Sequence, residues 1–116
     1  MDKESLTEKL LDLVEGRETP ESWRNWWDEH ETELEALLSR GEFLKLKPCR
    51  HGFQWVPVFG SQKRAIAILE KSGTAFEASN LYQERYLAEL DAFCKEQERV
   101  QREKQKEFKA NNPELF

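Results

Sequence analysis

The sequence predicts a single, mainly α domain of the α+β class, with two N-terminal helices, a small β-hairpin or meander and a long C-terminal helix. Three observations predict this class. Apolar residues recur at helical spacing in residues 5–39 and again after residue 74. Between these stretches apolar residues alternate with basic ones, as they do in a half-buried strand. A chain of 116 residues is also long enough for one modest core and too short for two.

The first two helices have recognisable start and stop signals. A capping box that begins at Ser5 predicts the start of the first helix, and Gly16 is expected to end it. Thr19 has the side chain of an N-cap for a second helix over residues 20–39. Pro20 then occupies its first position, where a missing N–H costs nothing.

In the middle of the chain the spacing of apolar residues changes from a helical period to the alternation typical of a strand. "FLKLK" alternates, and "FQWVPVFG" is aromatic and β-branched, so residues 43–59 are predicted to form a β-hairpin with Pro57 on an edge strand or at a bulge. Residues 62–71 fit either a third, buried strand or a short helix that Ser61 caps and Gly73 ends. The helix is favoured.

A long helix is expected to begin at Thr74, which forms a second capping box with Glu77, and to end at "NNP", residues 111–113. Its apolar stripe consists of Tyr82, Tyr86, Leu90, Phe93 and Val100.

The far half of this helix has almost nothing to bury, because Val100 is the only apolar residue between residues 95 and 107. We therefore expect residues 1–94 to form one compact domain that includes the start of the long helix. Residues 95–116 are expected to form the solvated, charged end of the helix and a tail.

The side chains of the tryptophan-rich segment could belong either to the hydrophobic core or to a functional site. Trp23, Trp26, Trp27 and His30 fall on one face of the predicted second helix, so we expect them to turn toward the core, with Trp26 at its rim. His30 is expected to be a hydrogen-bonded core histidine, because a histidine in the middle of an apolar face must find a hydrogen-bond partner or lose its charge. The segment "EHETE" lacks the second histidine of a zinc-protease helix, so no metal site is expected there. The opposite face carries acids.

Charge is unevenly distributed over a chain whose formal net charge is -5. Residues 1–47 hold 13 acids and 7 bases, whereas residues 43–69 contain no acid at all. The sequence therefore predicts a small acidic cytosolic protein that docks on a basic protein partner and inhibits or neutralises it, because complementary potentials speed encounter and suppress wrong partners. It is similar in type to inhibitors and immunity proteins that neutralise cationic nuclease toxins. The predicted partner-binding residues are Asp28, Glu31, Glu35 and Trp26.

Two alternatives stay open. The acid-free segment 43–64 interleaves bases with aromatic residues, a combination that neutralises phosphates and stacks bases, so nucleic-acid binding is a second hypothesis. Its predicted contact residues are Lys45, Lys47, Arg50, Trp55, Lys63 and Arg64. The third hypothesis is a helical adaptor or assembly protein that uses the long C-terminal helix.

The sequence contains no motif that indicates catalysis or metal binding. The chain has no phosphate-binding glycine loop and no nucleophile elbow, so we expect no enzymatic activity and no cofactor. Cys49 and His51 would supply only two ligands, so no metal site is expected. There is no signal-peptide core and no long apolar run, which predicts a cytoplasmic protein that makes no membrane contact and keeps Cys49 and Cys94 reduced.

Overall fold

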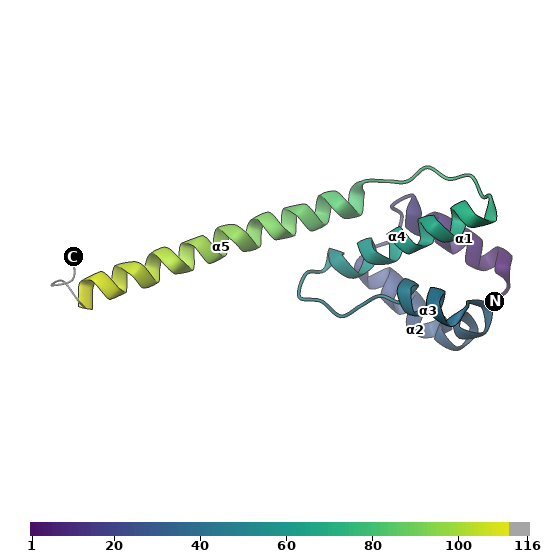
Figure 1. Ribbon diagram of the computed structural model, residues 1–116, viewed down its shortest axis with the longest axis horizontal. Coiled ribbons are helices and arrows are strands. Elements are labelled where there is room, and N and C mark those ends of the chain that lie inside the picture. The colour runs from purple at the N-terminus through teal and green to yellow at the C-terminus, as the bar shows by residue number, and fades with distance from the viewer. Residues whose placement is uncertain (112–116) are drawn as a thin grey trace.

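The computed structural model of the chain describes residues 1–111, with side chains as far as Phe108. Over this range its helices are α1 (Lys3–Val14), α2 (Pro20–Leu37), α3 (Arg40–Leu46), α4 (Trp55–Ser72) and α5 (Leu81–Asn111) (Figure 1). No strand occurs in residues 1–111, so the predicted α+β class and its hairpin at residues 43–59 are wrong. The predicted tail at residues 112–116 lies outside the described residues. Among the helices described, none is both long enough and apolar enough to cross a lipid bilayer.

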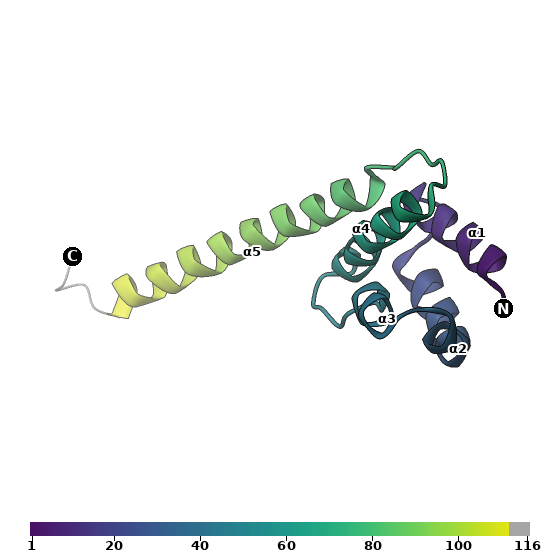
Figure 2. The same ribbon diagram turned by 45° about the vertical axis from the view of Figure 1, so that its right-hand side comes forward.

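The central helix is α4, which contacts each of the other four helices. In Figure 2 it lies between α5 and the group formed by α1, α2 and α3. The core is one cluster of buried side chains to which all five helices contribute. Its members are Leu6, Leu10, Leu13, Val14, Trp23, Trp27, Leu34, Phe43, Leu46, Val58, Ala65, Leu69 and Tyr82.

Local capping explains where α1 and α2 begin. The carboxylate of Asp2 caps α1 by accepting a hydrogen bond from the Ser5 backbone N–H at 2.8 Å, so Ser5 is not the cap that we expected. At α2 the prediction is confirmed: the Thr19 hydroxyl accepts from the Ser22 N–H at 3.0 Å, and Pro20 follows at the first helical position. These side-chain acceptors satisfy N–H groups that have no partner within the helix.

A tight turn after α1 lets a distant segment pack close to it. Gly16 has φ of +83°, and a Cβ built there would lie 2.7 Å from the Ser79 hydroxyl oxygen, so both the backbone conformation and the space require glycine. The Ser79 N–H donates to the Val14 carbonyl at 2.9 Å. The buried Gln62 side chain donates to the carbonyls of both residues, also at 2.9 Å. The connection before α5 is therefore tied to α1 and α4.

The predicted first strand is the helix α3. The Ser39 hydroxyl caps it by accepting from the Glu42 N–H at 3.2 Å. Phe43 and Leu46, three residues apart, are buried, whereas Leu44 between them is 57% exposed. The strand prediction failed because five alternating residues are too few to distinguish a period of 2 from one of 3.6.

The predicted second strand is the first turn of α4. Pro57 is the third residue of this helix, where its missing N–H removes no intrahelical hydrogen bond. Gln54, at the N-cap position, makes no side-chain capping bond. The capping carboxylate comes instead from Glu89 in α5. Because this contact joins positions far apart in the sequence, the local sequence around residue 54 does not predict it.

The favoured helix at residues 62–71 is confirmed, since α4 runs through it and ends before Gly73 in the left-handed conformation, at φ of +73°. Ser61 does not cap it. This residue lies inside α4, where its buried hydroxyl donates to the Leu46 carbonyl at 2.7 Å and joins α4 to the end of α3.

The last helix begins later than predicted, at Leu81 rather than Thr74. Residues 74–80 are drawn into the connection over α1 and α4 by the hydrogen bonds of Ser79, whose hydroxyl also accepts from the Leu81 N–H at 3.1 Å. The predicted capping box at Thr74 and Glu77 therefore does not start the helix, because tertiary contacts hold this segment in another conformation.

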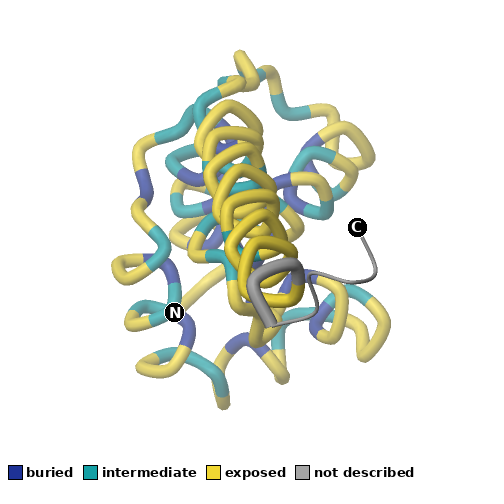
Figure 3. Tube along the Cα trace, turned by 90° about the vertical axis from the view of Figure 1, so that its left-hand side faces the viewer, coloured by how far each residue is buried: buried dark blue, intermediate teal, exposed yellow. Residues whose placement is uncertain are grey.

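The far part of α5 projects from the rest of the molecule. The helix has 31 residues and is about 46 Å long at 1.5 Å per residue. The molecule measures 70 × 28 × 21 Å with a radius of gyration of 20.3 Å, against about 13 Å for a compact chain of this length. Figure 3 looks along this arm, and its exposed turns extend toward the viewer.

Candidate protein-binding surface

The orientation of α2 decides where its acids lie. Trp23, Trp27 and Leu34 are fully buried, which confirms the predicted inward face. The Trp23 and Trp27 rings lie 6.0 Å apart, and Trp27 also contacts Phe43 of α3 at 5.3 Å between ring centroids. Because this face is buried in the core and packs on α3, the acids on the outer part of α2 have a fixed position.

The predicted acids Asp28, Glu31 and Glu35 lie on the flank of α2 that faces α3 and the loop after it. Glu31 forms an ion pair with Lys47 at the end of α3, with 2.9 Å between Oε1 and Nζ. Neither Asp28 nor Glu35 has an ion-pair partner among the described residues. Two of the three predicted carboxylates are therefore available to a partner.

The structure adds an apolar residue that sequence reasoning did not select. Leu44 of α3 is 57% exposed and lies between two adjoining hollows. The larger, of about 460 Å³, is lined by Asp28 and Glu31, and the smaller, of about 290 Å³, is lined by Glu35. We define the α2–α3 surface as Asp28, Glu31, Glu35 and Leu44. Leu44 was missed because the predicted strand gave no reason to place it beside α2.

The walls of the larger hollow carry charges of both signs. Besides the acids, it is lined by Arg24, Lys47 and Arg50. The Arg24 guanidinium donates to the Cys49 carbonyl at 2.9 Å, which ties the loop after α3 to α2. The same arginine borders a third hollow of about 560 Å³ beside the start of α2, where His51 and Trp55 also lie.

Trp26 lies apart from the acids with which it was grouped. Its ring is half-buried and stacks on Trp23 at 5.2 Å, with the Lys9 Nζ 5.4 Å from its centroid. Two helical positions separate it from Asp28 by about 200° around α2, so the two point to different sides. Trp26 therefore belongs to the α1 side and not to the α2–α3 surface.

His30 lies on the same side as Trp26, with 5.2 Å between the two rings. Its side chain is 33% exposed, so it lies at the edge of the core and not inside it. Its Nδ1 is 3.5 Å from the Glu33 carboxylate but makes no hydrogen bond within the described residues. The expected hydrogen-bonded core histidine is therefore not found.

The predicted nucleic-acid contact residues come from α3, the loop after it and α4. Lys45 and Arg50 are exposed on α3 and its following loop, while Lys47 is held by Glu31. On α4, the Lys63 Nζ lies 4.4 Å from the Phe59 ring centroid, and Arg64 is half-buried. Trp55 is half-buried as well and stacks on Tyr82 at 5.8 Å. The β-surface that this hypothesis required is absent from residues 1–111.

Cys49 and His51 lie on the exposed loop between α3 and α4. The His51 Nδ1 accepts a hydrogen bond from the Phe53 N–H at 3.0 Å, so the ring is engaged in shaping this loop. Within the part of the chain that the structure describes, no three His, Cys, Asp or Glu residues are placed to hold a metal ion. Cys49 and Cys94 are both exposed free thiols.

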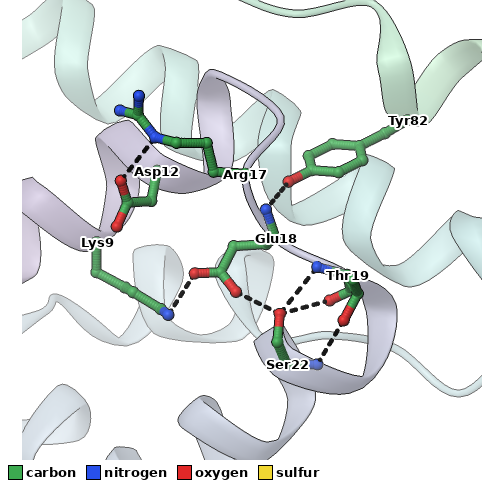
Figure 4. A network of polar contacts seen from close by, with 7 residues as sticks. All are labelled: Lys9, Asp12, Arg17, Glu18, Thr19, Ser22 and Tyr82. Carbon is green, nitrogen blue, oxygen red and sulfur yellow. Dashed lines mark hydrogen bonds and ion pairs between the residues drawn. The ribbon is translucent and has the colours of Figure 1, made fainter.

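A buried polar network joins α1, α2 and α5, and sequence reasoning did not find it (Figure 4). Glu18 is 6% exposed; its carboxylate pairs with Lys9 and accepts from the Ser22 hydroxyl. The Glu18 backbone N–H donates to the Tyr82 hydroxyl oxygen at 2.9 Å. Burial raises the pKa of Tyr82 to about 12, although the hydrogen bond from Glu18 acts in the opposite direction.

This network fastens the structure together and is not placed to carry out chemistry. The Ser22 hydroxyl already accepts from the Thr19 N–H as part of the α2 capping box, so it is occupied. Tyr82 is completely buried, which keeps its hydroxyl from substrate. The only signal in the sequence was a charged residue directly before the Thr19 cap.

No protein-family model, curated protein or solved structure matches this chain.

Proposed function

We propose that the chain is a small acidic binding protein whose α2–α3 surface docks on a basic protein partner and inhibits or neutralises it. The observation that carries the proposal is the position of Leu44, an exposed leucine between two hollows whose rims hold Asp28, Glu31 and Glu35 together with basic side chains. An apolar centre with a charged rim is the usual anatomy of a protein interface, in which the centre supplies burial and the rim supplies selectivity.

The charge of α2 defines the partner's chemistry. This helix carries six acids and one arginine, for a net charge of -5, equal to that of the whole chain. Such a concentration of one sign attracts a basic surface over several ångströms and raises the association rate, most strongly at low ionic strength. We therefore expect the partner to present lysines or arginines around an apolar depression.

The two carboxylates without internal partners give the surface its selectivity. Asp28 and Glu35 lie on either side of Leu44, one bordering each hollow. A partner whose basic side chains reach both hollows at once would bury Leu44 between them. Glu31 contributes less, because Lys47 already neutralises it at 2.9 Å.

The proposal can be tested by comparing what two charge-reversed variants capture from the native cell. In the first, Asp28, Glu31 and Glu35 are changed to Lys. In the matched control, the exposed acids Glu8, Glu70 and Glu77 are changed to Lys, which gives the same change in net charge away from the α2–α3 surface. The parent and the control are expected to retain the same basic protein, and the first variant is expected to lose it.

The captured protein is then purified, and its affinity is measured by calorimetry at several salt concentrations. Leu44→Ala is expected to weaken binding without lowering the melting temperature, because the leucine is mostly exposed. A partner that binds the Asp28, Glu31 and Glu35 variant as tightly as the parent would show that the site lies elsewhere. An acidic partner would contradict the charge argument.

A further inference from the structure

The arm of α5 is exposed on every side once it leaves the body. The part that packs on the body ends near Phe93, whose ring lies 5.4 Å from that of Phe53. From residue 94 to residue 108 every side chain is exposed except Val100, which is half-buried. The helical conformation of this arm therefore has to be explained without a hydrophobic face.

Composition supplies the first part of the explanation. Residues 95–107 contain nine charged residues and three glutamines, with Val100 as the remaining one. Glu, Lys, Arg and Gln are all good helix formers, and the segment contains neither Gly nor Pro. The arm is thus favourable to helix at twelve of its thirteen positions.

Ion pairs along the helix supply the second part. Asp91 pairs with Lys95 at 2.9 Å, and Glu98 with Arg102 at 3.6 Å, each four residues apart. Arg99 stands between two carboxylates, Glu96 at 2.5 Å and Glu103 at 2.7 Å. Opposite charges at these spacings stabilise a helix, and three of the four pairs have the more favourable order, with the acid first.

The packed part of α5 removes the cost of starting the helix. Nucleation is the unfavourable step in helix formation, whereas each further residue adds one hydrogen bond. Residues 81–94 are already helical on the body, so the arm only has to extend an existing helix.

The direction of the arm is set at two points along its base. Tyr82 is buried and accepts the hydrogen bond from the Glu18 N–H. Two turns later, the Glu89 carboxylate binds the first N–H groups of α4. A helix held at two points on one face cannot swing about either of them.

We propose that residues 95–107 form a self-supporting charged helix that acts as a rigid spacer, holding the far end of α5 at a fixed distance and direction from the α2–α3 surface. The inference is independent of what that surface binds.

The test measures a distance across the spacer in the full chain. Spin labels are attached to cysteines introduced by Lys45→Cys on α3 and Lys104→Cys on the arm, after Cys49→Ser and Cys94→Ser. Both lysines are exposed, and no ion pair involves either of them among the described residues. Pulsed electron paramagnetic resonance at low salt is expected to give one narrow distance distribution.

A matched pair of variants isolates the ion pairs. Glu98→Gln with Glu103→Gln removes two carboxylates that pair four residues along the arm, and is expected to broaden the distribution about twofold. Glu77→Gln with Glu107→Gln removes the same charge from exposed residues that form no ion pair within the described chain, and is expected to leave the distribution unchanged. Tryptophan fluorescence on unfolding should be the same for both variants, since neither alters the core.

Any of three results would overturn either the proposed rigidity of the arm or the proposed role of its ion pairs. A broad distribution for the parent would show that the arm is not rigid. A narrow distribution that survives the loss of Glu98 and Glu103 would show that the ion pairs do not support the helix. Equal broadening in both variants would assign the effect to net charge.

Discussion

Glu89 of α5 caps α4 by accepting a hydrogen bond from the Trp55 backbone N–H at 2.8 Å. Its second carboxylate oxygen accepts from the Gln54 N–H at the same distance. The negative charge also lies at the positive end of the α4 dipole. One side chain thus starts the central helix of the fold and fastens the base of the projecting arm to it.

We expect Glu89→Ala to lower the free energy of unfolding by ~1–2 kcal/mol, because α4 has no side-chain cap of its own. Urea unfolding followed by circular dichroism measures the change. Glu77→Ala, in the exposed connection before α5, is the control and should have little effect. Equal stability of the two variants would mean that water replaces the Glu89 carboxylate without loss.

The Tyr82 hydroxyl can be tested separately from its ring. Tyr82→Phe keeps the buried ring but leaves the Glu18 N–H without its acceptor, so a loss of ~1–3 kcal/mol is expected in the free energy of unfolding. Tyr86→Phe is the matched control, since Tyr86 is only half-buried and its hydroxyl makes no hydrogen bond within the described residues. If both variants lose the same amount, the Glu18 contact contributes nothing specific.

The raised pKa of Tyr82 predicts a loss of stability at high pH. Below pH 10.0 the phenol is protonated in both the folded and the unfolded chain, so the Tyr82 side chain makes its full contribution to the free energy of unfolding. Between pH 10.0 and about 12 the unfolded chain releases this proton while the folded chain retains it, which favours unfolding by up to ~3 kcal/mol. The free energies of unfolding of the parent and of Tyr82→Phe, plotted against pH, should therefore converge over this range, because all other groups titrate alike in both proteins. Parallel curves would contradict the pKa.

The two stacked tryptophans of α2 should respond differently to truncation. Trp23→Ala is expected to lower the free energy of unfolding by ~3–5 kcal/mol, because its indole is fully buried. Trp26→Ala should cost distinctly less, because its ring is half-buried. Thermal and urea unfolding of the two variants provide the comparison, and a smaller effect at Trp23 than at Trp26 would reverse the assignment of core and rim.

Charge reversal on α2 gives the complementary expectation. Changing Asp28, Glu31 and Glu35 together to Lys should leave the melting temperature nearly unchanged, because exposed ion pairs such as Glu31 with Lys47 contribute ~0–1 kcal/mol. Differential scanning calorimetry checks this. A large drop would mean that the loss of partner binding in this variant reflects unfolding.

The sequence by itself determined the features that depend on neighbours along the chain. The cap at Thr19, the proline after it and the glycine that ends α4 were predicted, because each acts within one helical turn. The inward face of α2 followed from periodicity over 18 residues, which is enough to define a helical face. The same periodicity placed Asp28, Glu31 and Glu35 outside the buried face, although the structure puts them on the flank beside α3 and not opposite the core.

Tertiary structure decided the rest, because the groups responsible lie far apart in the sequence. Residues 55–59, predicted as part of a hairpin, form the first turn of α4, which Glu89 caps from 34 residues away. Thr74 lost its role as a helix start because Ser79 bonds to Val14. Leu44 became part of the α2–α3 surface only when α3 packed beside α2. Short segments have weak intrinsic preferences, so burial and hydrogen bonds to distant residues determine their conformation.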